Sequence, residues 1–236
     1  MIAAIFDLDG TLYTGHIVNG IARHHRTHRV NRRWLYFYMG SHMPMWPLWR
    51  LGLMSEATAR DLWASHLGWT MRSMTEKEAA AAFAWIAEHY VLPRVRPDVL
   101  ARLQEHQTLG HRVILVSGTL SPLLAEIGRR LGVEETVGTP LVVRRGTYTG
   151  SCEPPSCQGA NKVARLEEHL QDTTQVDWAH SWAYADSHTD LPLLERLGNP
   201  VAVYPDEGLA ACARDRGWEI LGQDPRSTEL NLTQKA

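Results

Sequence analysis

Two aspartates stand one residue apart near the start of the chain. The sequence begins MIAAIFDLDGTL, so Asp7 and Asp9 follow a short apolar run and precede Gly10. Two carboxylates at this spacing could bind a metal ion, could serve as a nucleophile and an acid, or could form a turn in which Asp7 caps the following backbone. For an isolated Asp-x-Asp-Gly pattern, the turn accounts for the residues about as well as the chemical roles do. The choice depends on which other side chains the fold brings close.

Four further polar residues are candidates for that neighbourhood. Ser117 follows an apolar run, Lys162 opens a helix-like stretch, and Asp186 and Asp190 flank the end of another apolar run. Taken singly, Lys162 and Asp190 are typical of a helix surface, and Ser117 is typical of a turn or a helix cap. A chemical role requires that the fold gather them in one place.

The pattern of apolar runs indicates how they could be gathered. Short buried strands are predicted over 3–8, 111–116, 181–185 and 201–204. Helix-like stretches over 122–131, 190–197 and 207–216 follow the last three of them. Strands that alternate with helices predict parallel βαβ units, in which functional groups collect beyond the carboxyl ends of the strands. Polar residues stand at that end of three of the four runs, among them Ser117 and Asp186.

One long region interrupts this alternation. Residues 14–94 contain only helix-like stretches, over 17–28, 32–39, 55–67 and 75–90, the last opening with the capping-box pattern Thr75 to Glu78. We therefore predict a catalytic core formed by 1–13 and 95–222, a helical cap over 14–94 and a frayed polar tail over 223–236. Residues 139–150 are predicted to form a hairpin that turns at Arg145-Gly146.

Composition narrows the classes of function. The chain has 236 residues, of which 44% are hydrophobic and 21% charged, and a net charge of -2, which indicates neither nucleic acid nor an anionic membrane as a partner of the whole chain. The three cysteines, Cys152, Cys157 and Cys212, match neither a disulfide framework nor a usual zinc spacing. No signal peptide or transmembrane run is evident, and we expect a cytoplasmic protein without stable membrane insertion.

Four motifs in order along the chain resemble the haloacid dehalogenase superfamily. They are Asp7-Leu8-Asp9-Gly10-Thr11-Leu12, Val116-Ser117-Gly118-Thr119, Gly159-Ala160-Asn161-Lys162 and Ala185-Asp186-Ser187-His188-Thr189-Asp190. Each motif alone is weak, but four in order with typical separations are specific, and they cover essentially the whole chain. The helical insertion and the hairpin are similar to those of the phosphoserine-phosphatase-like branch. The resemblance implies a Rossmann-like parallel sheet flanked by helices, with the helical cap inserted after the first strand.

The resemblance also implies catalytic roles. Asp7 would attack phosphorus and form an aspartyl-phosphate, which divides one displacement into two easier ones. Asp9 would protonate the leaving oxygen and then accept a proton from water. Ser117, the amide of Gly118, and Lys162 would hold the phosphate oxygens, and Thr11 would also contact the phosphate.

A Mg²⁺ ion is implied by the same resemblance, because it prefers carboxylate, carbonyl and phosphate oxygens. Its protein ligands would be Asp7, the carbonyl of Asp9, and Asp186. Asp190 would lie outside this set and orient a metal-bound water or Lys162.

The sequence departs from the phosphoserine branch at the position that would read an amino group. A glutamate is usual shortly after the first motif, whereas His16 stands at that spacing here and no acid occurs between Thr11 and Arg29. Phosphoserine, other amino-alcohol phosphates, sugar phosphates and lipid-derived phosphates therefore all stay open as substrates.

The cap sequence admits two interpretations. The aromatic and methionine-rich stretches 32–39 and 43–50 could be cap core, or they could form an apolar wall for the leaving group or a patch that visits a membrane. The basic run 23–29 could be a solvated face, or a face including His16, Arg23 or Arg50 could attract an anionic substrate. We count His16 and Arg50 as candidate phosphate-binding residues.

The predicted function is Mg²⁺-dependent hydrolysis of a small phosphorylated metabolite. The alternatives are a phosphotransferase or phosphomutase that uses the same aspartates, and a non-catalytic phosphate-binding protein. The oligomeric state does not follow from the sequence.

Overall fold

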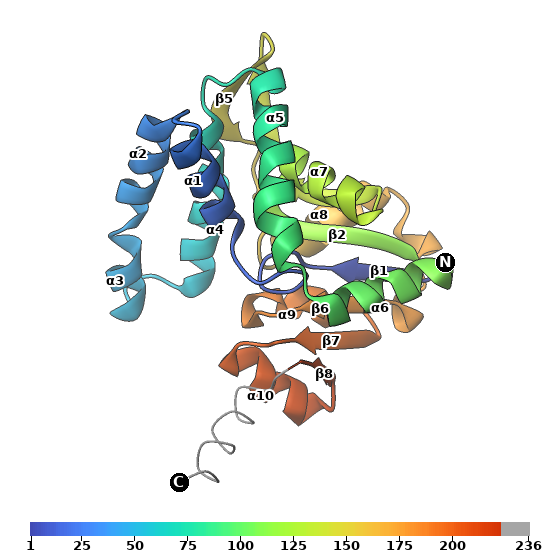
Figure 1. Ribbon diagram of the computed structural model, residues 1–236. Coiled ribbons are helices and arrows are strands. Elements are labelled where there is room, and N and C mark those ends of the chain that lie inside the picture. Colours follow the sequence, from blue (N-terminus) through green and yellow to red (C-terminus); the bar gives the residue numbers. More distant parts are fainter. Residues whose placement is uncertain (223–236) are drawn as a thin grey trace, which may run out of the picture.

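The structure, a computed structural model, describes residues 1–222, and the predicted polar tail lies outside them. Its centre is a parallel sheet in the strand order β3-β2-β1-β6-β7-β8 (Figure 1). These strands are β1 (Ala3–Phe6), β2 (Arg112–Leu120), β3 (Glu135–Thr139), β6 (Trp182–Ala185), β7 (Asn199–Val203) and β8 (Glu219–Leu221). The predicted Rossmann-like α/β core is confirmed by this sheet and its flanking helices.

Helices cover both faces of the sheet. The core helices are α6 (Pro97–Thr108), α7 (Ser121–Leu131), α8 (Asn161–Leu170), α9 (Leu191–Leu194) and α10 (Glu207–Arg216). Along β1, Ala4 and Phe6 pack with α6 and α7, whereas Ala3 and Ile5 pack on the opposite side with α8, α9 and α10. This alternation follows from the two-residue period of a strand, and burial on both faces explains why β1 is apolar throughout.

Two strands were not predicted. β3 contains Glu135, Thr136 and Thr139, so it lacks a continuous apolar run, and β8 has only three residues. Both lie at the edges of the sheet, where one flank is free of strand pairing and polar residues are tolerated.

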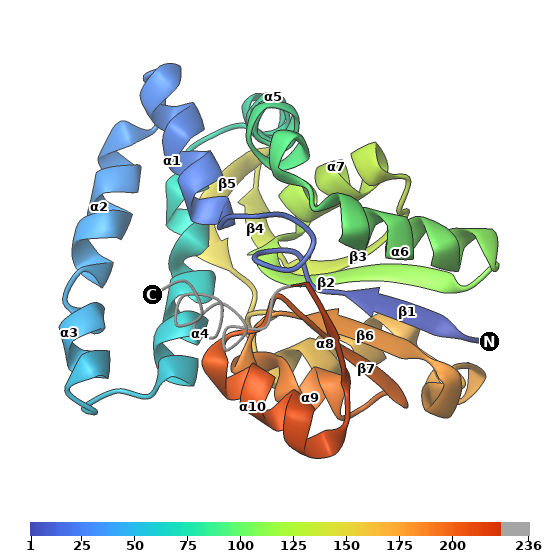
Figure 2. The same cartoon turned by 60° about the horizontal axis from the view of Figure 1, so that its bottom comes forward.

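The cap region consists of helices that lie beside the carboxyl ends of the strands (Figures 1 and 2). They are α1 (Ile17–Thr27), α2 (Arg32–His42), α3 (Met45–Arg50), α4 (Glu56–His66), the 3₁₀ turn η1 (Leu67–Met71) and α5 (Glu76–Ile86). The α5 helix continues through the π-helical turn η2 (Ala87–Val91) into the 3₁₀ turn η3 (Leu92–Arg94), which leads back to the core. The predicted capping box is present: Thr75 accepts from the amide of Glu78, whose carboxylate accepts from the amide of Thr75.

The short α3 helix is separated from α2 at Pro44. Pro44 is its N-cap and Pro47 is its third residue, where the missing N–H has no intrahelical acceptor in any case. The aromatic stretch is therefore two helices and not one continuous helix.

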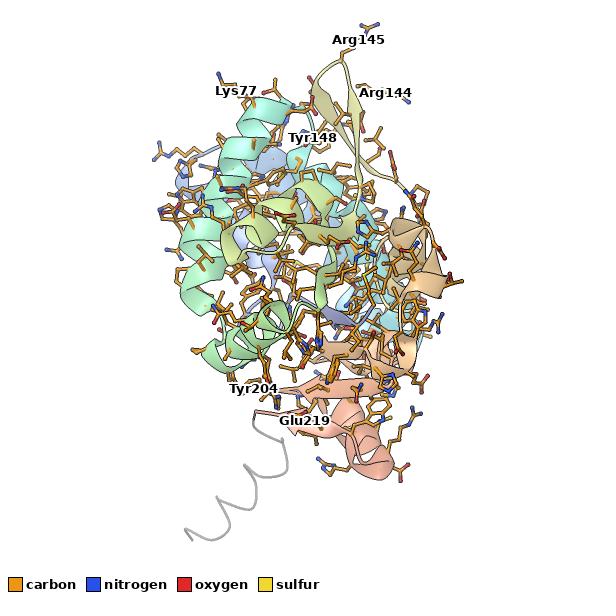
Figure 3. The ribbon with its side chains drawn as sticks, turned by 90° about the vertical axis from the view of Figure 1, so that its right-hand side faces the viewer. Lys77, Arg144, Arg145, Tyr148, Tyr204 and Glu219 are labelled. Carbon is orange, nitrogen blue, oxygen red and sulfur yellow. The ribbon has the colours of Figure 1, made fainter. Side chains whose placement is uncertain are left out.

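The predicted hairpin is formed by β4 (Leu141–Arg144) and β5 (Thr147–Cys152). Arg145 and Gly146 both have positive φ, at 51° and 71°, which is the backbone of a tight two-residue turn. In Figure 3 Arg144 and Arg145 lie at the tip of the hairpin, far from Tyr204 and Glu219 at the other end of the molecule. The base of the hairpin packs on η1 and α4, so the hairpin joins the core to the cap.

Candidate active site

Asp7 lies immediately beyond β1, at the carboxyl edge of the sheet. Its amide donates to the carbonyl of Tyr184 at 2.9 Å, which extends the pairing of β1 with β6 by one residue. The residue is only 5% exposed. The rigid strand thereby fixes the Asp7 carboxylate in a buried position.

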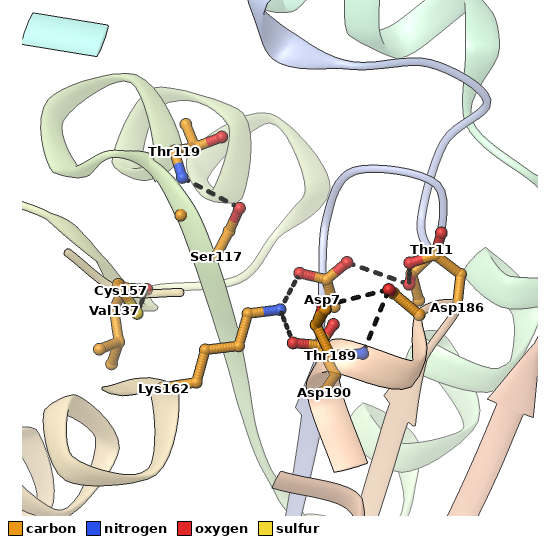
Figure 4. Close-up of polar contacts among 12 residues, drawn as sticks. Asp7, Thr11, Ser117, Thr119, Val137, Cys157, Lys162, Asp186, Thr189 and Asp190 are labelled. Atoms are coloured by element: carbon orange, nitrogen blue, oxygen red, sulfur yellow. Dashed lines mark hydrogen bonds and ion pairs between the residues drawn. The ribbon is translucent and has the colours of Figure 1, made fainter. Parts of the chain in front are cut away.

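Lys162 balances the negative charge of Asp7. It stands in the first turn of α8, is 2% exposed, and its Nζ lies 2.6 Å from Asp7 Oδ1 and 2.8 Å from Asp190 Oδ1 (Figure 4). Burial alone would lower the pKa of Lys162, but the charges of Asp190 and Asp7 outweigh it and hold the pKa above its usual range. Lys162 is therefore a permanent charge between two carboxylates.

Asp186 completes the acidic cluster from the end of β6. The Thr11 hydroxyl lies 3.0 Å from Asp186 Oδ1 and 3.1 Å from Asp7 Oδ2, so it links the two carboxylates (Figure 4). Burial, followed by the charges of Asp7 and Asp190, raises the pKa of Asp186 to about 8. Gly10 has φ +80°, and a Cβ there would stand 2.1 Å from an Asp186 oxygen, which explains the glycine after Asp9.

The cluster has the donors and the charge of a divalent-cation site. Oxygens of Asp7, Asp186 and Asp190 lie within 4.8 Å of one another. If all three carboxylates are ionised, Lys162 leaves them a net charge of about −2 in a buried place, which is costly without a counter-ion and accords with the raised pKa of Asp186. All the donors are carboxylate oxygens, the ligands that suit Mg²⁺. The structure thus brings together Asp7 and Asp186, the predicted side-chain ligands, and places Asp190 beside them in contact with Lys162.

Asp9 faces the start of the cap. Its Oδ1 accepts from the Tyr13 hydroxyl at 2.6 Å, and its Oδ2 accepts from the amide of Ile17 at 2.9 Å. Burial outweighs these hydrogen bonds and raises the pKa of Asp9 to about 6, with the charge of Asp7 contributing in the same direction. A carboxyl group with this pKa can hold or release a proton near neutral pH.

The segment around Ser117 is an irregular part of β2. The strand was predicted to end at Val116, but it continues to Leu120, and its register with β3 shifts between these residues. Ser117 is 2% exposed and its Oγ accepts from the amide of Thr119 at 3.2 Å. The Gly118 carbonyl accepts from the Thr139 hydroxyl at 3.0 Å, which anchors the bulge. The irregularity lets Ser117, Gly118 and Thr119 all line one cavity.

This cavity has a volume of about 510 Å³ and lies between the core and the cap. Asp7, Ser117, Lys162, Asp186 and Asp190 line its polar end. The cap contributes residues of α1, α2, α3, α4 and η1, which are mainly apolar and aromatic: Ile17, Val18, Tyr38, Met45, Trp49, Ala59, Trp63, Ala64 and Leu67. A polar end that holds reactive groups and a wide apolar end are typical of a small-molecule site.

The remaining predicted residues occupy different places. His16 lines the cavity as the N-cap residue of α1. Thr11 is fully buried and links Asp7 to Asp186, and it does not line the cavity as a phosphate-binding residue would. Arg50 is exposed at the end of α3 and is likewise not among the cavity-lining residues.

Other cavity residues were not predicted. Arg60 lines the cavity while it pairs with Glu56, one turn away on α4, at 2.8 Å. The Thr119 hydroxyl is buried and has no hydrogen-bond partner within residues 1–222, and the Gln158 side chain lies against Gly118. Trp63 and Arg60 could have been found only from the (i, i+3) spacing of α4, which shows a shared face but not what that face meets.

Residues 4–195 match the family model of haloacid dehalogenase-like hydrolases, and the chain belongs to this family. Curated relatives agree. The chain is 34% identical over 155 residues to the inhibition of morphological differentiation protein of Streptomyces azureus, covering 65% of this chain and 53% of that protein. It is 30% identical over 159 residues to a histidinol-phosphatase of Neisseria meningitidis, covering 66% and 71%. It is 29% identical over 226 residues to phosphoserine phosphatase SerB1 of Mycobacterium tuberculosis, covering 92% and 70%. The chain thus spans about half of the first relative's length.

Solved structures give the same fold. A protein of unknown function from Bordetella pertussis superposes with a TM-score of 0.76 at 26% identity, covering 93% of this chain and 97% of that one. A phospho-aspartyl intermediate analogue of phosphoserine phosphatase superposes with a TM-score of 0.58 at 16% identity, covering 98% of both chains. The predicted resemblance to the phosphoserine-phosphatase-like branch is confirmed.

Proposed function

We propose that this protein is a Mg²⁺-dependent phosphatase that hydrolyses a small phosphate monoester through an aspartyl-phosphate on Asp7. The observation that carries the proposal is the buried chain of contacts Asp190–Lys162–Asp7 at the polar end of the cavity. It presents one carboxylate to the cavity in a fixed orientation, beside a cation that would offset the charge of an incoming phosphate. The phosphatase names of the two relatives above favour the same reaction class.

The first step transfers the phosphoryl group to Asp7. A carboxylate oxygen of Asp7 bonds to phosphorus, the ester P–O bond breaks, and the leaving oxygen takes the proton held by Asp9. Lys162 and the Ser117 hydroxyl bind phosphate oxygens, while the amide of Gly118 donates to another. Asp190 is a positioning residue, because it contacts Lys162 rather than the phosphate.

The second step returns Asp7 to its starting state. Asp9, now ionised, accepts a proton from a water molecule whose oxygen bonds to phosphorus, and the bond between Asp7 and phosphorus breaks to release phosphate. The pKa of about 6 suits Asp9 to both directions of proton transfer. Asp7, Asp186 and the carbonyl of Asp9 would hold the Mg²⁺, with Asp190 outside this set, and the ion when bound would offset the negative charge of the phosphate.

The cavity indicates a leaving group with an apolar or aromatic part. Trp49, Trp63 and Tyr38 provide flat apolar surface, and the charged groups that the cap adds to the lining are the Glu56–Arg60 pair. Position 16 is a histidine and not an acid, so the amino group of a substrate such as phosphoserine would have to be bound by Glu56 instead. We therefore propose a larger, partly apolar monoester in preference to phosphoserine. A cytoplasmic location stays a prediction based on cysteine usage.

The test is phosphate release from a panel of phosphorylated metabolites and one aryl phosphate, with and without Mg²⁺. We expect Mg²⁺-dependent release, and at least a 10³-fold loss of kcat in Asp7→Asn with unchanged circular dichroism. Alcohol acceptors in the same assay distinguish transfer from hydrolysis. Substantial activity in Asp7→Asn would contradict the assignment of the nucleophile, and inactivity of the wild-type chain with every metal would favour a non-catalytic role.

A further inference from the structure

The outer surface of the cap has an unusual combination of exposed side chains. Nine of the thirteen large apolar side chains exposed within residues 1–222 fall in one short segment, 30–53. They are Val30, Tyr36, Phe37, Met39, Met43, Leu48, Trp49, Leu51 and Leu53. We call this set the cap apolar surface. Soluble proteins seldom expose so many large apolar groups together without a partner.

Along α2, large apolar side chains lie on the exposed face as well as on the buried one. Leu35, Tyr38 and His42 form the buried face of the helix. The opposite face carries Tyr36, at 49% exposed, and Phe37, at 54% exposed, where a surface helix normally carries charged and polar residues. After α3, Leu51 and Leu53 are each 72% exposed in the turn that leads to α4. In Figures 1 and 2, α2 and α3 form the outermost edge of the cap.

Charge is segregated onto the same segment. Residues 10–55 contain no aspartate or glutamate and six arginines: Arg23, Arg26, Arg29, Arg32, Arg33 and Arg50. The whole chain has 24 basic and 26 acidic residues, so the rest of the molecule is clearly acidic while this segment is basic. Arg32 and Arg33 open α2 on the same exposed side as Tyr36.

We propose that the cap apolar surface, with its arginines, docks on the surface of a bilayer that contains anionic lipids. Aromatic and aliphatic side chains would enter the interfacial region while the guanidinium groups bind lipid phosphates. A second copy of the chain fits less well as the partner, because a two-fold interface would bring the arginines of one copy against the same arginines of the other. Docking is peripheral: within residues 1–222, no helix has the length and apolar character needed to cross a bilayer. The inference is independent of the proposed phosphatase activity.

Trp49 connects the cap apolar surface to the cavity of the candidate active site. Its side chain belongs to the cap apolar surface and also lines the cavity. Met45, in the same short helix, lines the cavity but is not part of that surface. A docked cap would therefore hold the mouth of the cavity next to the lipid surface.

Flotation of the full chain with vesicles tests the proposal. We expect binding to vesicles of phosphatidylcholine with 30% phosphatidylglycerol, little binding to phosphatidylcholine alone, and loss of binding at high salt. Two variants divide the surface into its parts, Arg32→Gln/Arg33→Gln and Leu51→Ser/Leu53→Ser. Each arginine near an anionic leaflet contributes about fivefold to the partition coefficient. The double variant Arg32→Gln/Arg33→Gln should therefore partition into vesicles at least tenfold more weakly.

Matched controls lie elsewhere on the molecule. Arg144→Gln/Arg145→Gln removes two arginines from the tip of the hairpin (Figure 3), and Leu109→Ser removes a leucine that is 62% exposed beyond α6. Neither control should change vesicle binding, and none of the variants should change hydrolysis of a soluble aryl phosphate. The proposal is overturned if the wild-type chain does not float with anionic vesicles at low salt, or if the controls lose binding as the cap variants do. It is equally overturned if light scattering shows a stable dimer that the Leu51→Ser/Leu53→Ser variant dissociates and that does not bind vesicles.

Discussion

The two walls of the cavity are built in opposite ways. On the core side, Asp7, Lys162 and Asp190 are each at most 5% exposed and hold one another through charged contacts of 2.6 and 2.8 Å. On the cap side, Trp49 and Trp63 remain 41% and 42% exposed. The core wall can place a reacting group with precision, because its partners leave each side chain one position. The cap wall can select a leaving group by its shape and apolar surface, because it provides apolar contact area and no fixed charged contacts.

The buried histidines, by contrast, serve packing in both regions. In the core, His106 lies between His111 Nδ1 and the Tyr184 hydroxyl, each at 2.8 Å, as part of the packing beneath the sheet. In the cap, His42 contacts His66 at 3.1 Å and packs at a tilt against the ring of Trp69. The two walls therefore differ in their charged groups and not in their histidines.

The largest effect after loss of the nucleophile is expected for Lys162→Met. This change leaves Asp7 and Asp190 buried without their cation, and breaking a buried pair in this way costs about 3–5 kcal/mol. We expect kcat to fall by about 10²-fold or more and the free energy of unfolding, measured in a chelator, to fall by about 3 kcal/mol. Lys77→Met, on the exposed face of α5, is the control and should change neither (Figure 3). Equal effects in both variants would show that Lys162 is an ordinary surface charge.

A smaller and different effect is expected on the cap side. Trp63→Ala removes apolar area from the cavity wall but no charged contact, so it should raise KM for an aryl phosphate by about tenfold and leave kcat nearly unchanged. Trp178→Ala, remote from the cavity, is the matched control. If Trp63→Ala lowered kcat instead, the cap wall would take part in the chemistry and the comparison between the walls would fail.

The smallest effect concerns stability rather than turnover. Burial, with the charge of His111, lowers the pKa of His106 from 6.5 to about 4. Between these values the unfolded chain binds the proton and the folded chain does not, so the free energy of unfolding falls as the pH drops from about 6.5 to about 4. Replacing the residue, as in His106→Leu, should flatten this part of the curve in denaturant titrations at several pH values. The exposed control His89→Gln should keep the wild-type slope, and a slope unchanged in His106→Leu would assign the pH dependence to other groups.

Much of the core could be predicted because its strands are buried on both faces. The sequence shows β1, β2, β6 and β7 as short apolar runs, although β1 ends at Phe6, two residues before the predicted end of the first run. β3 and β8 could not be read, because edge strands have no continuous apolar signal. The extension of β2 past Ser117 was missed because a bulge depends on the neighbouring strand and has no local sequence pattern.

The site could be predicted in its members but not in its contacts. Asp7, Lys162, Asp186 and Asp190 meet as the order of the motifs indicates. The Tyr13 hydroxyl and the Ile17 amide that bind Asp9 depend on how the chain enters the cap, and the link from Thr11 to Asp186 joins residues 175 positions apart. Such contacts arise from tertiary packing, which residue spacing does not encode.

A crystal structure of the protein soaked with Mg²⁺ and beryllium trifluoride tests the central claim most directly, since the trifluoride mimics a phosphoryl group. The account predicts density for beryllium bonded to a carboxylate oxygen of Asp7, with fluorines facing Lys162 and Ser117 and a metal ion against Asp186. Beryllium on another side chain, or a metal ion at a different group of ligands, would contradict it.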